Sequence, residues 1–255
     1  MKFYKYCSFN PYILSDIKDK KITLSKASTF NDSFDSLPFY NTKEVGEILQ
    51  PSDAPYYICS FTKEFSSPIM WGHYGDSNYG FCIEYYIPSY SDSDEAYFQD
   101  IISSLILRVE YSKDNKRFDA TNHFKFLSEN KESFLSNNSR EFRDEYVEKV
   151  VDLYKYKDKN WAYEKEYRII FANVPNLLVK ESSKGRVSIT YRELKITKIT
   201  GIYFGERSND LTDINKIYLR DDLKRICNER NIAPYIMKKH ETEYKMVAEP
   251  FKLPI

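Results

Sequence analysis

The sequence predicts an α+β fold, with central mixed or antiparallel sheets, flanking helices and a two-helix insert. Short runs of alternating apolar and polar residues recur along the chain and predict strands. Segments with helical period flank them without a strict strand–helix–strand rhythm, which favours α+β over a doubly wound sheet. No repeat or linker rich in Pro, Gly or Ser divides the 255 residues, so we expect a single domain over residues 1–255.

The first part of the chain is predicted to alternate short strands with one helix. Residues 3–6 form a short strand in this prediction, and Asn10-Pro11 then starts a helix, because Asn is a good helix cap and Pro suits the first turn. Residues 22–24 are a second short strand. The run Asn31-Asp32-Ser33 is a turn or a helix cap, since Asn and Asp side chains satisfy local backbone donors.

Two strands with a short helix between them are predicted next. Residues 56–62 have the β-branched and aromatic content of a central strand. Ser67-Pro68 is a helix-start signal, so residues 69–74 are expected to form a short helix that Gly75 ends. Residues 79–87 follow as a strand. Phe81, Ile83 and Tyr85 would lie on one face of it, and Cys82, Glu84 and Tyr86 on the other.

The second half begins with another strand, at residues 105–111, and then changes period. From about residue 118 to 158 apolar residues recur at helical spacing, which predicts a two-helix insert that packs by one face. Residues 166–172 return to strand. Further strands are expected at 186–191, 200–204 and 234–238, with a helix over 211–228 between the last two.

Composition limits the classes of function. The chain has 38 basic and 38 acidic residues, so no global field draws it to nucleic acid or to an anionic membrane. It has neither an apolar leader nor a membrane-length apolar run, and its four cysteines have no paired spacing. We therefore expect a cytoplasmic protein with reduced thiols, in which Cys59 and Cys82 serve as small hydrophobes. His73 with these two thiols lacks the spacing of a zinc site, so no metal is predicted.

The working surface is expected to come mainly from residues 58–84 and 161–170. In the first segment, Ser60-Phe61-Thr62 leads into a short helix that bears Trp71, His73 and Tyr74, which could frame one pocket near the strand end. The alternative is a structural Trp and a hydrogen-bonded His that close the corner between strand and helix. One sequence leaves both interpretations open.

The second segment carries acidic residues at spacing two. If it is a strand throughout, Glu164, Glu166 and Arg168 share one face, and two close carboxylates would raise the pKa of one of them unless Arg168 compensates. Such pairs occur at active sites. They also occur on plain solvated strand faces, which stays the alternative here.

These segments resemble a known family. The residues concerned are Tyr4-Lys5-Tyr6, Leu24, Ser28 to Asp35, Cys59 to Thr62, Pro68 to Tyr74, Gly80 to Glu84 and Trp161 to Arg168. In this order, over nearly the whole chain, they are similar to the bacterial family catalogued as domain of unknown function 2971. The family name implies no reaction.

A looser resemblance is to the ADP-ribosyltransferase superfamily, which carries three short strand-borne motifs. Tyr4-Lys5-Tyr6 would correspond to the first motif, Ser60-Phe61-Thr62 to the second and Glu164-x-Glu166 to the third. The resemblance implies NAD as substrate, a carboxylate that stabilises the charge developing on the ribose, and Trp71 or Tyr74 stacked on the nicotinamide. Lys5 stands where the superfamily has His or Arg, and the long insert separates the second and third motifs.

The sequence thus supports three functions. The first is an NAD-consuming ADP-ribosyltransferase or NAD glycohydrolase, with Glu166 as principal carboxylate, Glu164 assisting an unknown protein or nucleic-acid acceptor, and a role in bacterial (anti-phage) defence or as a toxin. The second is a non-enzymatic ligand- or partner-binding module. Its pocket would be lined by Trp71, His73, Tyr74 and Glu84. The third, a nucleic-acid-processing protein, fits poorly with zero net charge.

Overall fold

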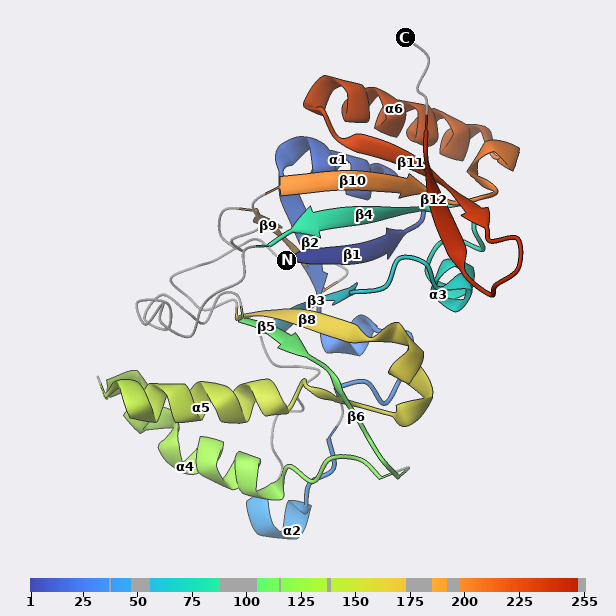
Figure 1. Cartoon of the computed structure of the whole chain (residues 1–255). Coiled ribbons are helices and arrows are strands. Elements are labelled where there is room, and N and C mark those ends of the chain that lie inside the picture. The colour runs from blue at the N-terminus through green and yellow to red at the C-terminus, as the bar shows by residue number, and fades with distance from the viewer. Residues whose placement is uncertain are drawn as a thin grey trace.

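The fold is a ten-stranded mixed sheet with helices packed on both faces (Figure 1). The structure, a computed structural model, describes residues 1–36, 38–46, 56–87, 105–114, 116–136, 139–172, 185–191 and 198–251. The predicted α+β class is confirmed.

Twelve strands in the described ranges form the main sheet and a small second sheet. They are β1 (Lys2–Cys7), β2 (Lys21–Ser25), β3 (Tyr56–Thr62), β4 (Phe81–Tyr86), β5 (Leu105–Arg108), β6 (Glu110–Tyr111), β7 (Tyr156–Lys157), β8 (Glu166–Ala172), β9 (Arg186–Thr190), β10 (Lys198–Phe204), β11 (Ala233–Lys239) and β12 (Met246–Pro250). The α-helices are α1 (Pro11–Asp19), α2 (Thr42–Val45), α3 (Pro68–His73), α4 (Thr121–Ser136), α5 (Arg140–Asp152) and α6 (Ile214–Arg230). The 3₁₀ turns are η1 (Ala27–Thr29), η4 (Lys159–Glu164) and η6 (Ser208–Asp210).

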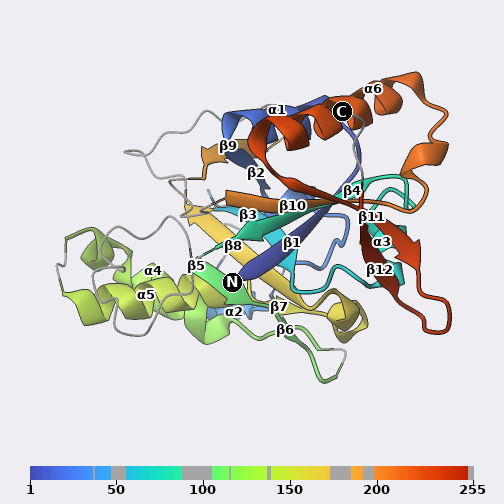
Figure 2. The same ribbon diagram turned by 45° about the horizontal axis from the view of Figure 1, so that its top comes forward.

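The strands of the main sheet pair in the order β12-β11-β10-β4-β1-β3-β2-β9, and β8 and β5 branch from β3. Only β10 and β11 pair in parallel, through the crossover helix α6; the other pairs of this sheet are antiparallel. Helices α1 and α6 lie side by side over one face, as Figure 2 shows from above. The insert helices α4 and α5 lie together at the other end of the molecule.

The predicted helix starts are present with their caps. Asn10 accepts a hydrogen bond from the backbone N of Ile13 at 3.0 Å, and Ser67 accepts one from Met70 at 3.4 Å. Helix α6 begins at residue 214 and not at 211, because Asp213 is its cap and accepts from the backbone N of Asn215 at 2.9 Å.

The cap at Asn10 gives a direct test of this local account. Asn10→Ala is expected to lower the free energy of unfolding by about 1 kcal/mol, because a backbone donor of α1 loses its partner. Asn10→Asp keeps an acceptor oxygen and should change stability far less. Urea denaturation of both variants measures the difference, and equal stability of the two would contradict the capping role.

Several strands differ from the prediction. The expected strand 105–111 is two strands, because at Val109 the backbone N donates to the carbonyl of Glu166 and the chain leaves β8. Its second part, β6, pairs with β7 in a separate two-stranded sheet. Strand β12 was not predicted, since it is an edge strand with a mixed polar sequence and no clear period. The two-helix insert is confirmed as α4 and α5.

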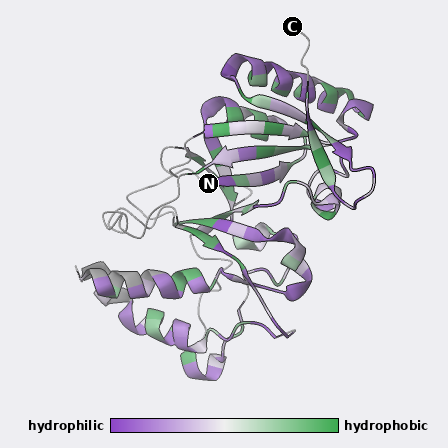
Figure 3. Cartoon of the chain, in the orientation of Figure 1, coloured by the Kyte–Doolittle hydropathy of each residue, from purple (hydrophilic) through white to green (hydrophobic). Residues whose placement is uncertain are grey.

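Three apolar clusters hold the layers together. The largest lies beneath α1 and α6 and includes Phe3, Phe61 and Phe81, while the smaller two lie on the opposite face of the sheet. One of these, around Ile58 and Ile170, packs the insert; the other packs α3 and holds Trp71, Cys82 and Tyr203. Hydrophobic and hydrophilic residues are interspersed along the helices and strands (Figure 3). In β4, Phe81, Ile83 and Tyr85 belong to the largest cluster, whereas Cys82 belongs to the cluster beneath α3. The face assignment predicted for β4 is therefore correct.

The cysteines and the helices agree with two further sequence expectations. All four cysteines are free thiols and buried, and Cys59 and Cys82 pack within apolar clusters as small hydrophobes. Among the helices of the described ranges, none has the length and apolar character that a membrane crossing requires.

Candidate functional site

The sheet forks along one edge of β3. On its other edge β3 pairs with β8 over seven residues, but the forked edge meets β1 only at Tyr4–Thr62 and β2 only at Ser25–Ile58. Between these two contacts the neighbouring strands diverge from β3. The gap opens on the sheet face that lies between the two smaller apolar clusters.

A cavity of about 160 Å³ lies at this fork. It is bordered by Tyr4, Lys5, Tyr6, Phe30, Asn31, Asp35, Ser60, Phe61, Thr62, Tyr74, Lys157, Glu164 and Glu166. The strand β1, the serine-bearing strand β3 and the acidic segment after the insert, which are far apart in the sequence, all contribute. The structure thus brings together eight of the ten residues singled out from the sequence; Trp71 and His73 are not at its wall.

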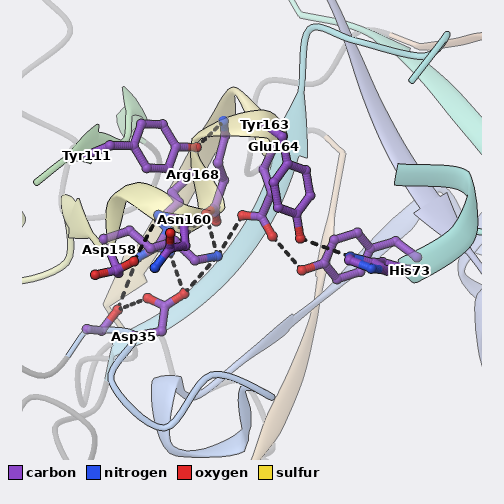
Figure 4. Close-up of polar contacts among 12 residues, drawn as sticks. Asp35, His73, Tyr111, Asp158, Asn160, Tyr163, Glu164 and Arg168 are labelled. Atoms are coloured by element: carbon purple, nitrogen blue, oxygen red, sulfur yellow. Dashed lines mark hydrogen bonds and ion pairs between the residues drawn. The ribbon is translucent and has the colours of Figure 1, made fainter. Parts of the chain in front are cut away.

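Arg168 is the centre of the polar network behind the cavity. Its guanidinium is fully buried and binds Glu166 bidentately, with Nε 2.8 Å from Oε1 and Nη2 3.0 Å from Oε2. Nη2 also donates to Asp35 at 2.7 Å (Figure 4). Nη1 donates to Ser36 and to the carbonyl of Tyr154. Each nitrogen of the guanidinium has a partner, which is the condition for burying it.

Lys157 lies among three carboxylates. Its Nζ is 2.6 Å from Glu164, 3.2 Å from Glu166 and 3.3 Å from Asp35, all of them buried. The ammonium occupies the position between these oxygens that a metal cation would otherwise take. No group of three or more His, Cys, Asp or Glu side chains able to hold a metal ion occurs in the part of the chain that the structure describes.

The network has one negative charge in excess when every member is ionised, because three carboxylates face two cations. Burial alone would raise the pKa of Glu166, but Arg168 and Lys157 outweigh burial and lower that pKa to about 2. Burial raises the pKa of Glu164, and Lys157 only partly opposes it. Of the two glutamates, Glu164 is therefore the one that takes up a proton first as the pH falls.

Glu164 does not lie on a strand, and the expected face shared by Glu164, Glu166 and Arg168 is wrong in that respect. Glu164 ends the 3₁₀ turn η4, and Lys165, with a left-handed backbone at φ 45°, turns the chain into β8. The turn still brings Glu164 beside Glu166, through Lys157. The alternative of a solvated strand face is wrong as well, because all three side chains are buried.

A row of polar side chains leads from Glu164 to the surface. Tyr74 donates to Oε1 of Glu164, and Tyr163 lies beside Tyr74. The hydroxyl of Tyr163 lies 2.9 Å from Nδ1 of His73, whose ring is exposed (Figure 4). His73 thus reaches the cavity through two tyrosines and not directly.

The strand residues at the cavity differ in where their side chains point. Tyr4, Thr62 and Glu166 are register partners on one face of the sheet, and Ser60 shares that face and bonds Glu166. The hydroxyl of Tyr6 donates to the carbonyl of Glu64, and the backbone N of Glu64 donates to Thr62.

Lys5 borders the cavity but does not extend its ammonium into it. Strand alternation places Lys5 with Phe3 and Cys7 on the opposite face, where its Nζ is 5.9 Å from the centre of the Phe61 ring. Lys5, which the resemblance places in the first NAD-binding motif, therefore directs its charged end away from Ser60 and Glu166.

Trp71 and Glu84 do not line the cavity, contrary to two expectations. Trp71 is fully buried in the cluster beneath α3, and its Nε1 donates to the carbonyl of Phe65 at 2.8 Å. The structural interpretation of Trp71 is thus correct, and a stacking role on a ligand is not. Glu84 is buried at a separate place and accepts from Tyr4 and Tyr203 at 3.0 and 2.8 Å.

Asp35, Lys157 and Tyr163 belong to the site but were not assigned to it from the sequence. Asp35 ends the Ser28–Asp35 run quoted for the family resemblance, which was a usable signal. Lys157 follows the helical insert as one charged residue among many. Two of its three carboxylate partners, Glu164 and Glu166, lie within ten residues, yet nothing in their spacing distinguishes a buried cluster from a solvated loop.

Comparison with known families gives one match. A family described as "Protein of unknown function (DUF2971)" matches residues 70–169, so the similarity is shorter than the nearly full-length resemblance expected from the motifs. The matched part contains Lys157, Glu164, Glu166 and Arg168 but not β1 or β3. No significant match is found among curated proteins or solved structures, and nothing in these comparisons points to the ADP-ribosyltransferases.

Proposed function

We propose that the cavity holds the nicotinamide–ribose end of NAD and that the chain breaks the bond between them. The observation that carries this proposal is the meeting of β1, β3 and the acidic segment around one cavity whose polar network has a carboxylate in excess. The nicotinamide ring of NAD is positively charged, and breaking its bond moves that charge to the ribose. A fixed negative site stabilises such charge where water is excluded.

Of the two glutamates, Glu164 is the better candidate for proton transfer in the reaction. Glu166 is the better candidate for holding the neighbouring side chains in position. When the C–N bond breaks, its electron pair leaves with nicotinamide, and an acceptor hydroxyl or water then bonds to the ribose carbon. Its proton passes to the ionised form of Glu164. Because Glu164 borders the cavity and has a raised pKa, it suits this exchange.

The row of side chains from Glu164 through Tyr74 and Tyr163 offers the proton a route to His73 and the solvent. Glu166 has both oxygens bound to Arg168 and Lys157, and so its charge is already neutralised. We therefore propose that Glu166 positions Lys157, which in turn positions Glu164. Glu164 thus keeps the acceptor-assisting role expected for it, whereas Glu166 changes from the principal carboxylate to a positioning residue.

A non-enzymatic binding module is the second candidate. The observation that favours it is that each oxygen of Glu164 already accepts a hydrogen bond from the protein, one from Tyr74 and one from Lys157. A network so completely paired can recognise a cationic ligand without reacting with it. The pocket of that module would be the cavity at the fork, not the set of residues first expected for it.

The two candidates are separated by adding NAD to the purified protein. Enzymatic function predicts a saturable rise in melting temperature together with release of free nicotinamide, which chromatography detects. A rise in melting temperature without nicotinamide release supports the binding module. If NAD causes neither the rise nor the release, both candidate functions are refuted. Tyr244→Ala is a matched control, since Tyr244 is fully exposed and should leave shift and release unchanged.

The acceptor follows from the product. Release of free ADP-ribose would identify water as acceptor, whereas ADP-ribose attached to a protein or nucleic acid would identify a transferase. Either reaction depletes NAD, which would suit a bacterial defence or toxin component.

A further inference from the structure

A second hollow adjoins the cavity at the fork. Its volume is about 560 Å³. It is lined by Asp32, Phe34 and Pro38, by side chains from the segment that ends at Phe118, and by side chains from the end of the insert and η4. Lys157 borders both hollows. The fork cavity, at about 160 Å³, is smaller than the ~300–1,000 Å³ of typical small-molecule sites, whereas the second hollow is within that range.

Aromatic rings line the second hollow. Phe118 and Tyr156 stack with their centres 4.1 Å apart and their planes inclined by 18°. Trp161 lies on the side toward the fork cavity, with its ring centre 4.9 Å from Nζ of Lys157. Phe34 is 63% exposed, an unusual state for a large apolar side chain. Such flat, partly accessible rings suit a planar base.

The rim of the hollow carries cationic side chains, and the acidic side chains near them have hydrogen-bond or ion-pair partners close in sequence. Arg117 and Lys116 are exposed there. Among the acidic residues, Asp32 accepts from the backbone N of Phe34, and Asp158 accepts from that of Asn160. Asp114 lies 3.6 Å from Lys116. The guanidinium of Arg117, over the ring of Phe39, is available to an anionic group beside the rings.

We propose that this second hollow binds an adenosine monophosphate unit, with the purine on the aromatic rings and the phosphate toward Arg117. The inference rests on the proposed function, because it assigns the remainder of NAD to a place next to its reacting end. Lys157 borders both hollows, so a ligand that passes this side chain would extend from one hollow into the other. Neither the nicotinamide half nor the adenosine half of NAD alone would fill both hollows.

The test uses the chain's two tryptophans as reporters. Trp71 is fully buried in a core cluster, so a ligand in the second hollow should quench only Trp161. We expect AMP to quench the fluorescence saturably, and ribose 5-phosphate, which lacks the base, to bind more weakly. Trp161→Phe should remove the quenching while calorimetry still detects AMP binding.

Trp161→Ala should weaken AMP by about tenfold or more, since base stacking contributes roughly 1–3 kcal/mol. It should leave the affinity for nicotinamide mononucleotide nearly unchanged, and Tyr244→Ala should affect neither ligand. Unaltered AMP affinity in Trp161→Ala, or no AMP binding at all, would overturn the assignment even if NAD is cleaved. AMP bound as expected without nicotinamide release would support the assignment and refute the proposed reaction.

Discussion

Replacing Arg168 with methionine should lower the free energy of unfolding by about 3–5 kcal/mol, the usual effect of removing one partner from a buried ion pair. Methionine fills similar space but leaves Glu166 and Asp35 without their main counter-charge in a place that water does not reach. Urea denaturation at pH 7.5 measures the loss. It would rank among the largest single-residue effects in the chain.

The pH dependence of this loss has a definite sign. Without Arg168, burial is expected to raise the pKa of Glu166 in the folded state, so this carboxylate destabilises the fold when ionised and less when protonated. The gap between variant and wild type should therefore narrow as the pH falls from 7.5 toward 5. Arg225→Met is the matched control, because Arg225 is exposed and its solvent-screened ion pairs should contribute little to stability. Equal losses at the two positions would contradict the role given to Arg168.

Replacing Glu164 with glutamine should reduce nicotinamide release by about 10²–10⁴-fold, the range for loss of a general acid–base group. Glutamine keeps the shape of the protonated acid: its carbonyl oxygen can accept from Lys157, and its NH2 can donate to the hydroxyl oxygen of Tyr74. The fold is therefore expected to survive. The rate is measured by chromatography at saturating NAD, and an unchanged rate would exclude Glu164 from the reaction.

The same variant should show an unusual stability profile. Because the pKa of Glu164 is raised on folding, its contribution is fully present below the ordinary glutamate value of about 4.3 and is lost as the pH rises through the folded pKa. Glutamine avoids that loss, so Glu164→Gln should gain stability relative to wild type between pH 4.5 and 8.

Glu166→Gln should do the reverse. The pKa of Glu166 is about 2 in the folded chain, so its stabilisation is present above about pH 4.3 and disappears as the pH falls toward 2. The variant leaves Arg168 with a weakened partner and should be less stable than wild type at neutral pH. A test that relied on Glu166→Gln alone would therefore confuse lost activity with lost folding.

Elements with a regular local signal were predictable from the sequence. The alternation of β4, the Ser67-Pro68 start of α3 and the two-helix insert each follow from residues within a few positions of one another. Strand β12 was missed because its residues show no clear period. The elements that were predicted thus depend on local interactions, and the strand that was missed has no local pattern to indicate it.

The site was predictable only in part, because its geometry depends on distant partners. Period two placed Glu166 beside Arg168 correctly, but the left-handed Lys165 interrupts the strand that was expected to continue to Glu164. Asp35 meets Arg168 across more than a hundred residues of chain. Only the folded sheet reveals that the acidic segment is buried and that Trp71 is too.

The single residue pair that joins β1 to β3 has a mechanical consequence. The strands β12, β11, β10, β4 and β1 form one group, and β3, β2, β9, β8 and β5 form the other. The register pair Tyr4–Thr62 joins these two groups, or leaves, of the sheet. The cavity occupies the angle between the leaves. Residues of β1 and β3 border it together with Phe30, Asn31 and Asp35 of the loop after η1, so a ligand seated there would contact both groups of strands at once.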